Sequence, residues 1–189
     1  MVISRPAYLV VLAGLSIERH FELRLSKRNA QRALAHGAIE VRRGQYRFMV
    51  AFQALFLVAC GGEALFRNPA FPEFLSLLAL LGEAVAQALR YWSVATLGER
   101  WNTRVIVVPD TPPVTWGPYR YIRHPNYLAV VLDIACVPLI RGLMITAAVF
   151  SAANAILLAW RIRLEEHALG DRYQRAFAER GRFIPGILG

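Results

Sequence analysis

The stretch from Gly117 to Tyr127 carries the densest group of residues able to bind or react with a small molecule. It reads GPYRYIRHPNY and holds three tyrosines, two arginines and one histidine between apolar segments. Pro125 stands where the polar run becomes apolar, so it is predicted to lie in the first turn of a helix, where its missing N–H costs nothing. His124 and Asn126 would then lie at that helix N-terminus, which favours an anionic group. The alternative is an interfacial belt of tyrosines and arginines at a membrane surface.

A second group of charged residues follows the last apolar segment, in the run RIRLEEHAL. In one continuous helix, Asn154, Arg161 and Glu165 fall on one stripe, at spacings of 7 and 11 residues. Arg161 could hold a carboxylate by paired hydrogen bonds, and a desolvated Glu165 or Glu166 could act as a base. The alternative is a solvated helix face on which Arg161 and Glu165 pair, stabilising the helix by roughly 0.3 kcal/mol.

Apolar segments flank both groups and must position them. With 189 residues, 56% of them hydrophobic, and a mean hydropathy of +0.37, the chain is too apolar for an ordinary soluble domain. It is interpreted as a single all-α membrane domain, residues 1–189, with about five transmembrane helices and a C-terminal helix emerging from the membrane. Windows near the ~20 residues that cross a bilayer occur at Pro6–Leu23, Tyr46–Phe66, Phe74–Trp92, Pro125–Ile140 and Leu143–Trp160. Only Arg141 and Gly142 separate the last two windows, which predicts a tight helical hairpin.

The distribution of basic residues predicts an orientation. Of the 22 Lys and Arg residues, 18 lie in the connections after the first and third spans, at their borders (Arg47 and Arg90) or in the C-terminal tail. The positive-inside rule then places these segments and the C-terminus in the cytoplasm and the N-terminus outside. Because the basic residues alternate with apolar spans, the net charge of +9 favours anionic lipid over nucleic acid as a partner.

Several smaller features narrow the interpretation. Cys60 and Cys136 lie inside apolar segments, so neither a disulfide framework nor a metal site is predicted. The first span lacks the flanks of a cleavable signal peptide and is expected to remain as a helix. The β-branched run Val105–Val108 is predicted to be extended or interfacial. Glu63 and Glu83, inside the second and third spans, are expected to bond across helices.

The motif, the single acid Asp133 in the next apolar segment, and the run RIRLEEHAL followed by Tyr173, Arg180 and Pro185 resemble the isoprenylcysteine carboxyl methyltransferase family. The likeness runs from about Leu97 to Pro185 and is to bacterial members. It implies an enzyme of the inner membrane that uses S-adenosylmethionine, yields S-adenosylhomocysteine and has its active site facing the cytoplasm. Residues 1–95 would supply three spans, and residues 96–189 the catalytic half.

The resemblance also implies site residues. Arg161 and Glu166 align with residues associated with substrate and methyl transfer, and Glu165 and Arg163 are the second choices, since the RxRxEE register is ambiguous by one residue. The cofactor would be held by Val114, Gly117, Tyr119, Arg123, His124, Tyr127, Asp133 and Asn154. Two departures from the family pattern stand out: Thr111–Val114 replaces a His-x-Leu-Val sequence, and the tail after Glu166 is shortened. The acceptor pocket is therefore expected to differ.

The predicted function is O-methylation of a membrane-borne, lipid-like acceptor. A carboxylate of the prenylcysteine type is already a nucleophile at pH 7, whereas an alkylated phenol or enol must first lose its proton. Phospholipid N-methylation and a lipid-binding membrane protein without chemistry are the alternatives. A carrier is less favoured because neither internal repeats nor broken helices are visible. No obligatory protein partner is predicted.

Overall fold

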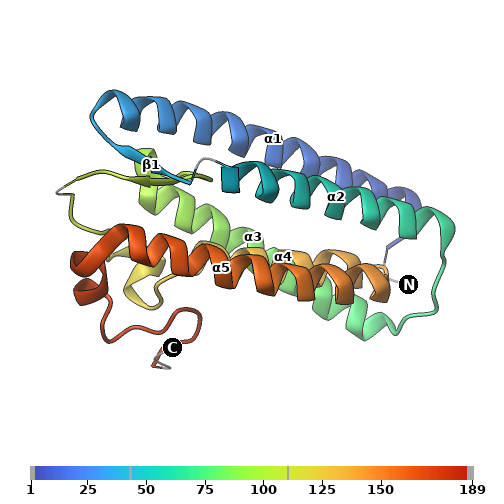
Figure 1. Ribbon diagram of the computed structural model, residues 1–189. Coiled ribbons are helices and arrows are strands. Elements are labelled where there is room, and N and C mark those ends of the chain that lie inside the picture. The colour runs from blue at the N-terminus through green and yellow to red at the C-terminus, as the bar shows by residue number, and fades with distance from the viewer. Residues whose placement is uncertain (1–2, 43, 110, 187–189) are drawn as a thin grey trace.

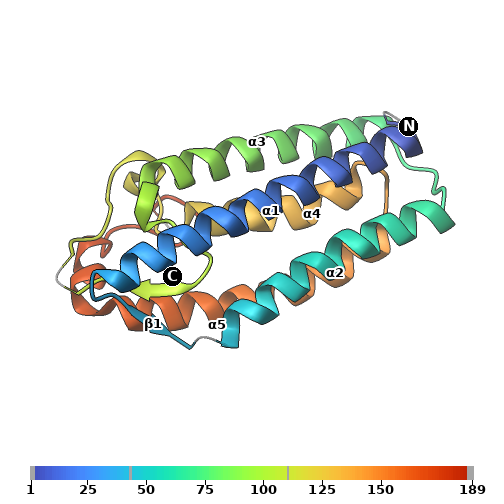
Figure 2. The same ribbon diagram turned by 90° about the horizontal axis from the view of Figure 1, so that it is seen from above.

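The computed structural model describes residues 3–42, 44–109 and 111–186. Within these ranges, five α-helices form two layers, α1 and α2 in one and α3, α4 and α5 in the other (Figure 1, Figure 2). The elements are α1 (Arg5–Ala35), β1 (Ile39–Val41), α2 (Gly44–Phe66), α3 (Glu73–Leu97), the 3-10 turn η1 (Gly98–Arg100), β2 (Val105–Val107), the 3-10 turn η2 (Gly117–Arg120), α4 (Pro125–Leu139) and α5 (Met144–Ala176). A helix occupies each predicted apolar window, and the predicted membrane helical bundle is confirmed.

α1 continues well past its predicted apolar window. Its N-terminus is capped by Ser4, whose hydroxyl accepts from the Ala7 N–H at 3.4 Å, and Pro6 lies in the first turn. The second half of α1 is rich in charge, so α1 does not meet the composition of a span. In the described part of the chain, α2, α3 and α5 are long and apolar enough to cross a membrane, while α4 is apolar but has 15 residues.

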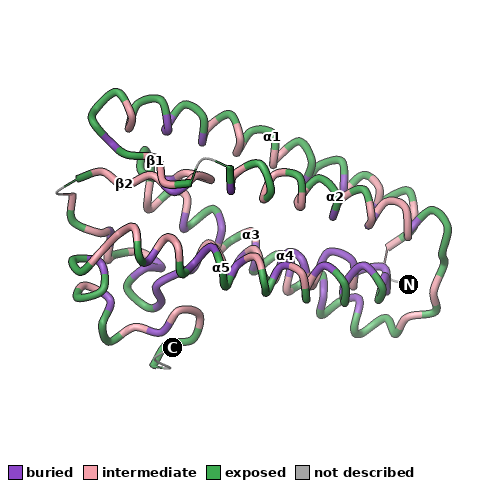
Figure 3. The backbone as a smooth tube through the Cα atoms, in the orientation of Figure 1, coloured by how far each residue is buried: buried purple, intermediate pink, exposed green. Residues whose placement is uncertain are grey.

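The apolar core lies between the two layers. Tyr8 of α1 is fully buried against α4, where its hydroxyl donates to the Val137 carbonyl at 3.1 Å. Phe56 and Phe150 pack with ring centroids 5.5 Å apart and join α2 to α5. The outer helix faces are exposed (Figure 3) and carry large apolar side chains, among them those of Val58, Leu78, Leu81, Val149 and Ile156. Apolar faces of this extent are suited to lipid rather than water.

The α4–α5 connection confirms the predicted tight hairpin. Gly142 adopts a φ of +69°, and a Cβ at this position would lie 2.5 Å from Cβ of Phe71 in the α2–α3 connection. Glycine is needed here both for the left-handed backbone and for the close approach. α5 then continues without interruption from Met144 until Gly170, whose non-helical backbone (φ 68°, ψ −168°) kinks its last turns.

A short β-sheet corrects the all-α prediction in one detail. β1 and β2 pair antiparallel, with Ile39 opposite Val107 and Val41 opposite Val105. The predicted extended conformation of the Val105–Val108 run is thus confirmed, and its partner is the α1–α2 connection. The sheet ties the end of α1 to the segment that leads into the motif.

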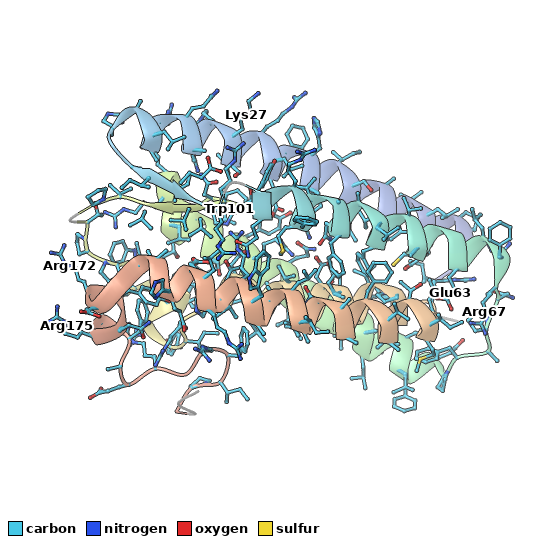
Figure 4. All side chains as sticks on the ribbon, viewed as in Figure 1. Lys27, Glu63, Arg67, Trp101, Arg172 and Arg175 are labelled. Atoms are coloured by element: carbon cyan, nitrogen blue, oxygen red, sulfur yellow. The ribbon has the colours of Figure 1, made fainter. Side chains whose placement is uncertain are left out.

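The long polar connections gather at one end of the bundle, which we call the polar end. β1, β2, η2 and the C-terminal tail lie there, and the N-terminus lies at the opposite end (Figure 1). Arg172 and Arg175 extend from the polar end, whereas Glu63 and Arg67 lie at the other (Figure 4). Alternating helix directions therefore bring together the segments that the charge distribution predicted to share one side of the membrane.

The two glutamates inside α2 and α3 differ. Glu63 accepts hydrogen bonds from the Thr146 N–H at 2.8 Å and hydroxyl at 2.7 Å, which confirms a bond across helices. For Glu83 the expected cross-helix hydrogen bond is not found within the described residues. Its carboxylate instead accepts from Gln87, one turn along α3, at 2.5 Å.

Candidate active site

The motif forms η2 and the start of α4. α4 begins at Pro125, as predicted, with His124 as the preceding residue. The N–H groups of Arg123 and His124 donate to the carbonyls of Gly181, at 2.9 Å, and Arg182, at 3.1 Å. The C-terminal tail thus pairs with the motif, and its contact with the His124 N–H occupies one of the groups at the helix N-terminus that the sequence left available for an anion.

A cavity of about 630 Å³ lies at the polar end beside the motif. Six segments contribute to its walls: the end of α1, η1, β2, residues 111–114, the motif, and the part of α5 that is predicted to lie in the cytoplasm. Cavities of a few hundred Å³ or more bind cofactor-sized molecules. The elements that form the walls are far apart in sequence, so the cavity exists only in the folded bundle.

The structure brings together six of the predicted site residues at this cavity: Val114, Tyr119, Arg123, His124, Tyr127 and Glu165. The other five do not line it: Gly117, Asp133, Asn154, Arg161 and Glu166. Each of these five has a different place in the fold.

Arg161 lies directly behind the cavity wall. Its Nε donates to the Tyr127 hydroxyl at 2.9 Å, and Nη2 donates to the Thr103 carbonyl at 2.8 Å. The Tyr127 hydroxyl in turn donates to Oε2 of Glu165. Arg161 is 3% exposed, yet its Nη1 has no hydrogen-bond partner in the described residues. A buried guanidinium nitrogen without a partner is costly, so this side chain has capacity for a further acceptor.

Glu166 points away from the cavity. One of its oxygens, Oε1, lies 3.0 Å from Nε2 of His124, and Arg182 donates to both carboxylate oxygens, at 3.1 and 2.6 Å. This hydrogen bonding raises the pKa of the Arg182 guanidinium, which therefore stays charged. Consecutive helical residues point about 100° apart, so Glu165 and Glu166 cannot share one environment. The sequence left both residues open, and the structure places Glu165 at the cavity.

Asp133 lies in a closed cluster between α1, α3 and α4. Its Oδ2 accepts from Nη2 of Arg19 at 3.0 Å and from Nη2 of Arg90 at 2.9 Å. The carboxyl group is almost completely buried and already has two charged partners. Among described atoms, neither Arg19 nor Arg90 lines the cavity.

Gly117 and Asn154 also lie outside the cavity wall. Gly117 has a φ of +59°, and a Cβ there would lie 2.4 Å from Oγ1 of Thr96, so it shapes the entry into η2. Asn154 is buried two turns before Arg161 on α5, and its Oδ1 lacks a hydrogen-bond partner among the residues described.

One wall of the cavity is aromatic. Tyr173 and Phe177 pack with centroids 4.6 Å apart and belong to one small apolar cluster with Tyr119 and Val114. Burial raises the pKa of Tyr119 far above its ordinary value, so its phenol stays neutral at pH 7. His124 stacks on Tyr127 at 5.3 Å. The wall offers flat apolar surfaces with few charges.

Asn126, which the sequence placed at the helix N-terminus of a candidate anion site, also lines the cavity. Sequence reasoning assigned no site role to several other lining residues, among them Arg32, His36, Trp101, Asn102, Leu169, Tyr173 and Phe177. Trp101 was a detectable signal, because it lies near the start of the region from Leu97 to Pro185 that resembles the family. Arg32 lies in the last turn of α1 and His36 directly follows this helix, far before the resembling region, and no pattern marked them. Trp101 lies between α1 and α5 (Figure 4), where it lines the cavity.

The sequence of the chain is similar to those of known proteins. Residues 77–171 match the isoprenylcysteine carboxyl methyltransferase (ICMT) family. The uncharacterized protein YpbQ of Bacillus subtilis is 35% identical over 164 residues, which cover 87% of this chain and 97% of that protein. An uncharacterized protein of Haemophilus influenzae is 26% identical, over 88% of this chain and 97% of the relative. The cobalt-zinc-cadmium resistance protein CzcN of Cupriavidus metallidurans is 28% identical, over 83% of this chain and 68% of that protein.

A solved structure has the same fold. The eukaryotic intramembrane Ras methyltransferase ICMT (isoprenylcysteine carboxyl methyltransferase) superposes with a TM-score of 0.57 at 24% identity. The match covers 79% of this chain and 55% of that protein, so the chain spans about half the length of the solved enzyme.

Proposed function

Because the chain belongs to the isoprenylcysteine carboxyl methyltransferase family and has the fold of a membrane methyltransferase, we propose that it transfers a methyl group from S-adenosylmethionine to an oxygen of a membrane-borne, lipid-like acceptor. One observation carries this proposal: the cavity beside the motif, where Tyr127 and Glu165 meet next to buried Arg161. The acceptor and the cofactor are both part of the proposal.

Unpartnered polar atoms support the fit of a polar ligand in the cavity. Nε1 of Trp101 and Oδ1 of Asn126 belong to lining residues, and both atoms are buried without a hydrogen-bond partner among described residues. An indole N–H can only donate, and an amide oxygen can only accept. A ligand with donors, acceptors and an aromatic base, such as an adenosyl group, would satisfy these atoms and pack on Tyr119 and Phe177.

When bound, S-adenosylmethionine supplies a methyl group already activated by a positive sulfonium. The chain's residues then have to orient the acceptor oxygen and exclude water. Val114, Tyr119, Arg123, His124 and Tyr127 are the residues proposed to hold the cofactor. The Glu165 carboxylate at the same wall would favour a positive group nearby. No other activation is required of the protein for an acceptor that is already ionised.

Two acceptor chemistries use the same cluster differently. A carboxylate is ionised at pH 7 and needs only a cation to orient it, a role that the unpartnered Nη1 of Arg161 would fill. A phenol, with an ordinary pKa near ~10, must transfer its proton to a base, and Glu165 at the cavity wall would accept it. The acceptor's alkyl chain would enter from the bilayer, where an apolar molecule is concentrated.

The orientation in the membrane completes the proposal. We propose that the polar end faces the cytoplasm of a bacterial inner membrane, which would give the cavity access to cytosolic S-adenosylmethionine. Single cysteines introduced near Arg42 and Arg175 should react with an impermeant thiol reagent only from the cytoplasmic side, and one near Arg67 only from outside. Labelling of the first two positions from outside would contradict this orientation.

Titration of the purified protein with S-adenosylmethionine tests the cofactor. We expect saturable binding by isothermal calorimetry, weakened about tenfold by His124→Ala, which corresponds to roughly one hydrogen bond. His20→Ala removes an exposed histidine of α1 and serves as the matched control, with unchanged affinity. Wild-type affinity in both His124→Ala and Tyr127→Ala would show that the site is misplaced. No binding by the wild-type protein would favour a lipid-binding protein without chemistry.

A further inference from the structure

The C-terminal tail reaches the cavity wall only through other residues. Arg182 does not line the cavity, but two of its guanidinium nitrogens donate to Glu166, with Nε 3.1 Å from Oε1 and Nη2 2.6 Å from Oε2. Such a two-point contact fixes the orientation of a carboxylate as well as its position. The backbone adds to the hold, since the His124 N–H donates to the Arg182 carbonyl at 3.1 Å.

Glu166 passes this constraint to His124. Its Oε1 lies 3.0 Å from Nε2 of the imidazole, and both side chains are buried. An ionised carboxylate can only accept, so Nε2 must carry the proton. In the neutral ring this leaves Nδ1 as an acceptor on a residue that lines the cavity. Arg123 lies farther from Glu166, with Nη1 3.9 Å from Oε1, and cannot replace the two-point contact of Arg182.

The orientation of the imidazole matters for the rest of the site. His124 stacks on Tyr127 with centroids 5.3 Å apart and lies 6.3 Å from the ring of Tyr173. Tyr127 is the residue whose hydroxyl joins Arg161 to Glu165. A rotation of the His124 ring would therefore disturb both a cavity wall and the support of Tyr127.

We infer that Arg182 is a positioning residue that acts through Glu166 to hold the His124 ring in one orientation and one tautomer at the cavity wall. This assigns Glu166 a positioning role in place of the catalytic one that the sequence predicted. The consequence for cofactor affinity rests on the proposed function, whereas the tautomer does not.

The first measurement is the nitrogen-15 spectrum of the histidine rings in protein labelled at histidine, without any ligand. The chain has four histidines, and the His124 signals are those that His124→Ala removes. We expect a single tautomer in the wild-type protein, protonated at Nε2. Arg182→Gln should convert it to a mixture of tautomers, because Glu166 loses the contact that orients it. Arg182→Lys keeps the charge and one donor and should restore the single tautomer in part.

The second measurement is the affinity for S-adenosylmethionine. Arg182→Gln should weaken binding about tenfold, with partial recovery in Arg182→Lys, in parallel with the tautomer. Arg175→Gln is the matched control, since it removes the same charge from an exposed residue of the last turn of α5 and should change neither readout. A general electrostatic role of the tail would make both glutamine variants equal and would overturn the inference.

Two further outcomes decide the matter. A wild-type tautomer in folded Arg182→Gln contradicts the inference, whatever the affinity. If Arg182→Gln does not fold, Glu166→Leu, which has no acceptor for Nε2–H, is measured in its place, and retention of the single Nε2-protonated tautomer there also contradicts it. If the wild-type protein does not bind S-adenosylmethionine, the proposed function fails while the ligand-free spectra still test the positioning role.

Discussion

Two groups of charged residues in this bundle both combine arginine with a carboxylate but differ in how the charges meet. In the Asp133 cluster, formed by Asp133, Arg19, Arg90 and Glu22, opposite charges touch directly, at distances of 3.0, 2.9 and 2.7 Å. In the Arg161 cluster, formed by Arg161, Tyr127 and Glu165, Nε and the carboxylate are 4.0 Å apart and a phenol hydroxyl lies between them.

This difference distinguishes a cluster that holds helices together from a cluster that could take part in a binding site. Directly paired charges in the Asp133 cluster use their capacity on one another and hold α1 and α3 to α4, away from the cavity. The arginine and glutamate of the Arg161 cluster are kept apart, one of the guanidinium nitrogens has no partner among described residues, and Glu165 borders the cavity. A buried charged residue is therefore a better indicator of function when another group separates it from the opposite charge and when a cavity lies beside it.

The largest effect is expected from breaking the Asp133 cluster. Asp133→Asn keeps the shape of the side chain but removes the buried carboxylate charge that Arg19 and Arg90 share, which should lower the free energy of unfolding by about 3–5 kcal/mol. Unfolding in detergent micelles measures this loss, and Glu99→Gln, which breaks an exposed pair with Arg32, should cost about 1 kcal/mol or less. The folded fraction should still bind S-adenosylmethionine. Wild-type stability with lost cofactor binding would instead make Asp133 a cofactor residue, as the sequence predicted.

The next largest effect is expected on catalytic activity. Arg161→Ala should lower kcat/KM for a prenylcysteine analogue about a hundredfold, because an orienting, charge-stabilising donor is removed from the reacting oxygen. Transfer of a labelled methyl group measures this loss, and the affinity for S-adenosylmethionine should change little. Arg163→Ala, at an exposed position two residues along α5, is the control. Equal losses in both variants would contradict the assignment of Arg161.

The smallest effect is expected from a substitution that tests whether Glu165 acts as a base. Glu165→Gln should lower activity on an alkyl phenol about tenfold at pH 7 and leave a carboxylate acceptor nearly unaffected. The loss should be relieved toward pH 10, because the phenol then ionises without a base. Activity profiles from pH 6 to pH 10 on the two acceptors measure this difference. An equal loss on both acceptors at every pH would exclude Glu165 as the base.

Local patterns in the sequence were sufficient for the course of the chain. The five apolar windows, the start of α4 at Pro125 and the α4–α5 hairpin depend on residues within a few positions of one another, and all were confirmed. The motif also contains residues that the fold brings together, since Tyr119, Arg123, His124 and Tyr127 line one cavity. Helix periodicity, the missing N–H of proline and glycine's freedom at positive φ act locally, so they can be recognised without the fold.

Only the tertiary structure decided which side chains meet. Glu165 borders the cavity and Glu166 does not, although the two residues are adjacent in sequence. The other contacts join residues that are distant in sequence: the arginines around Asp133, the pairing of β1 with β2, and the contact of Arg182 with Glu166. The end of α1 became a cavity wall although no pattern in its sequence indicated this. Such contacts follow from the packing of whole helices, where the cost of leaving a buried charge unpaired selects one arrangement, and a local pattern carries no information about that selection.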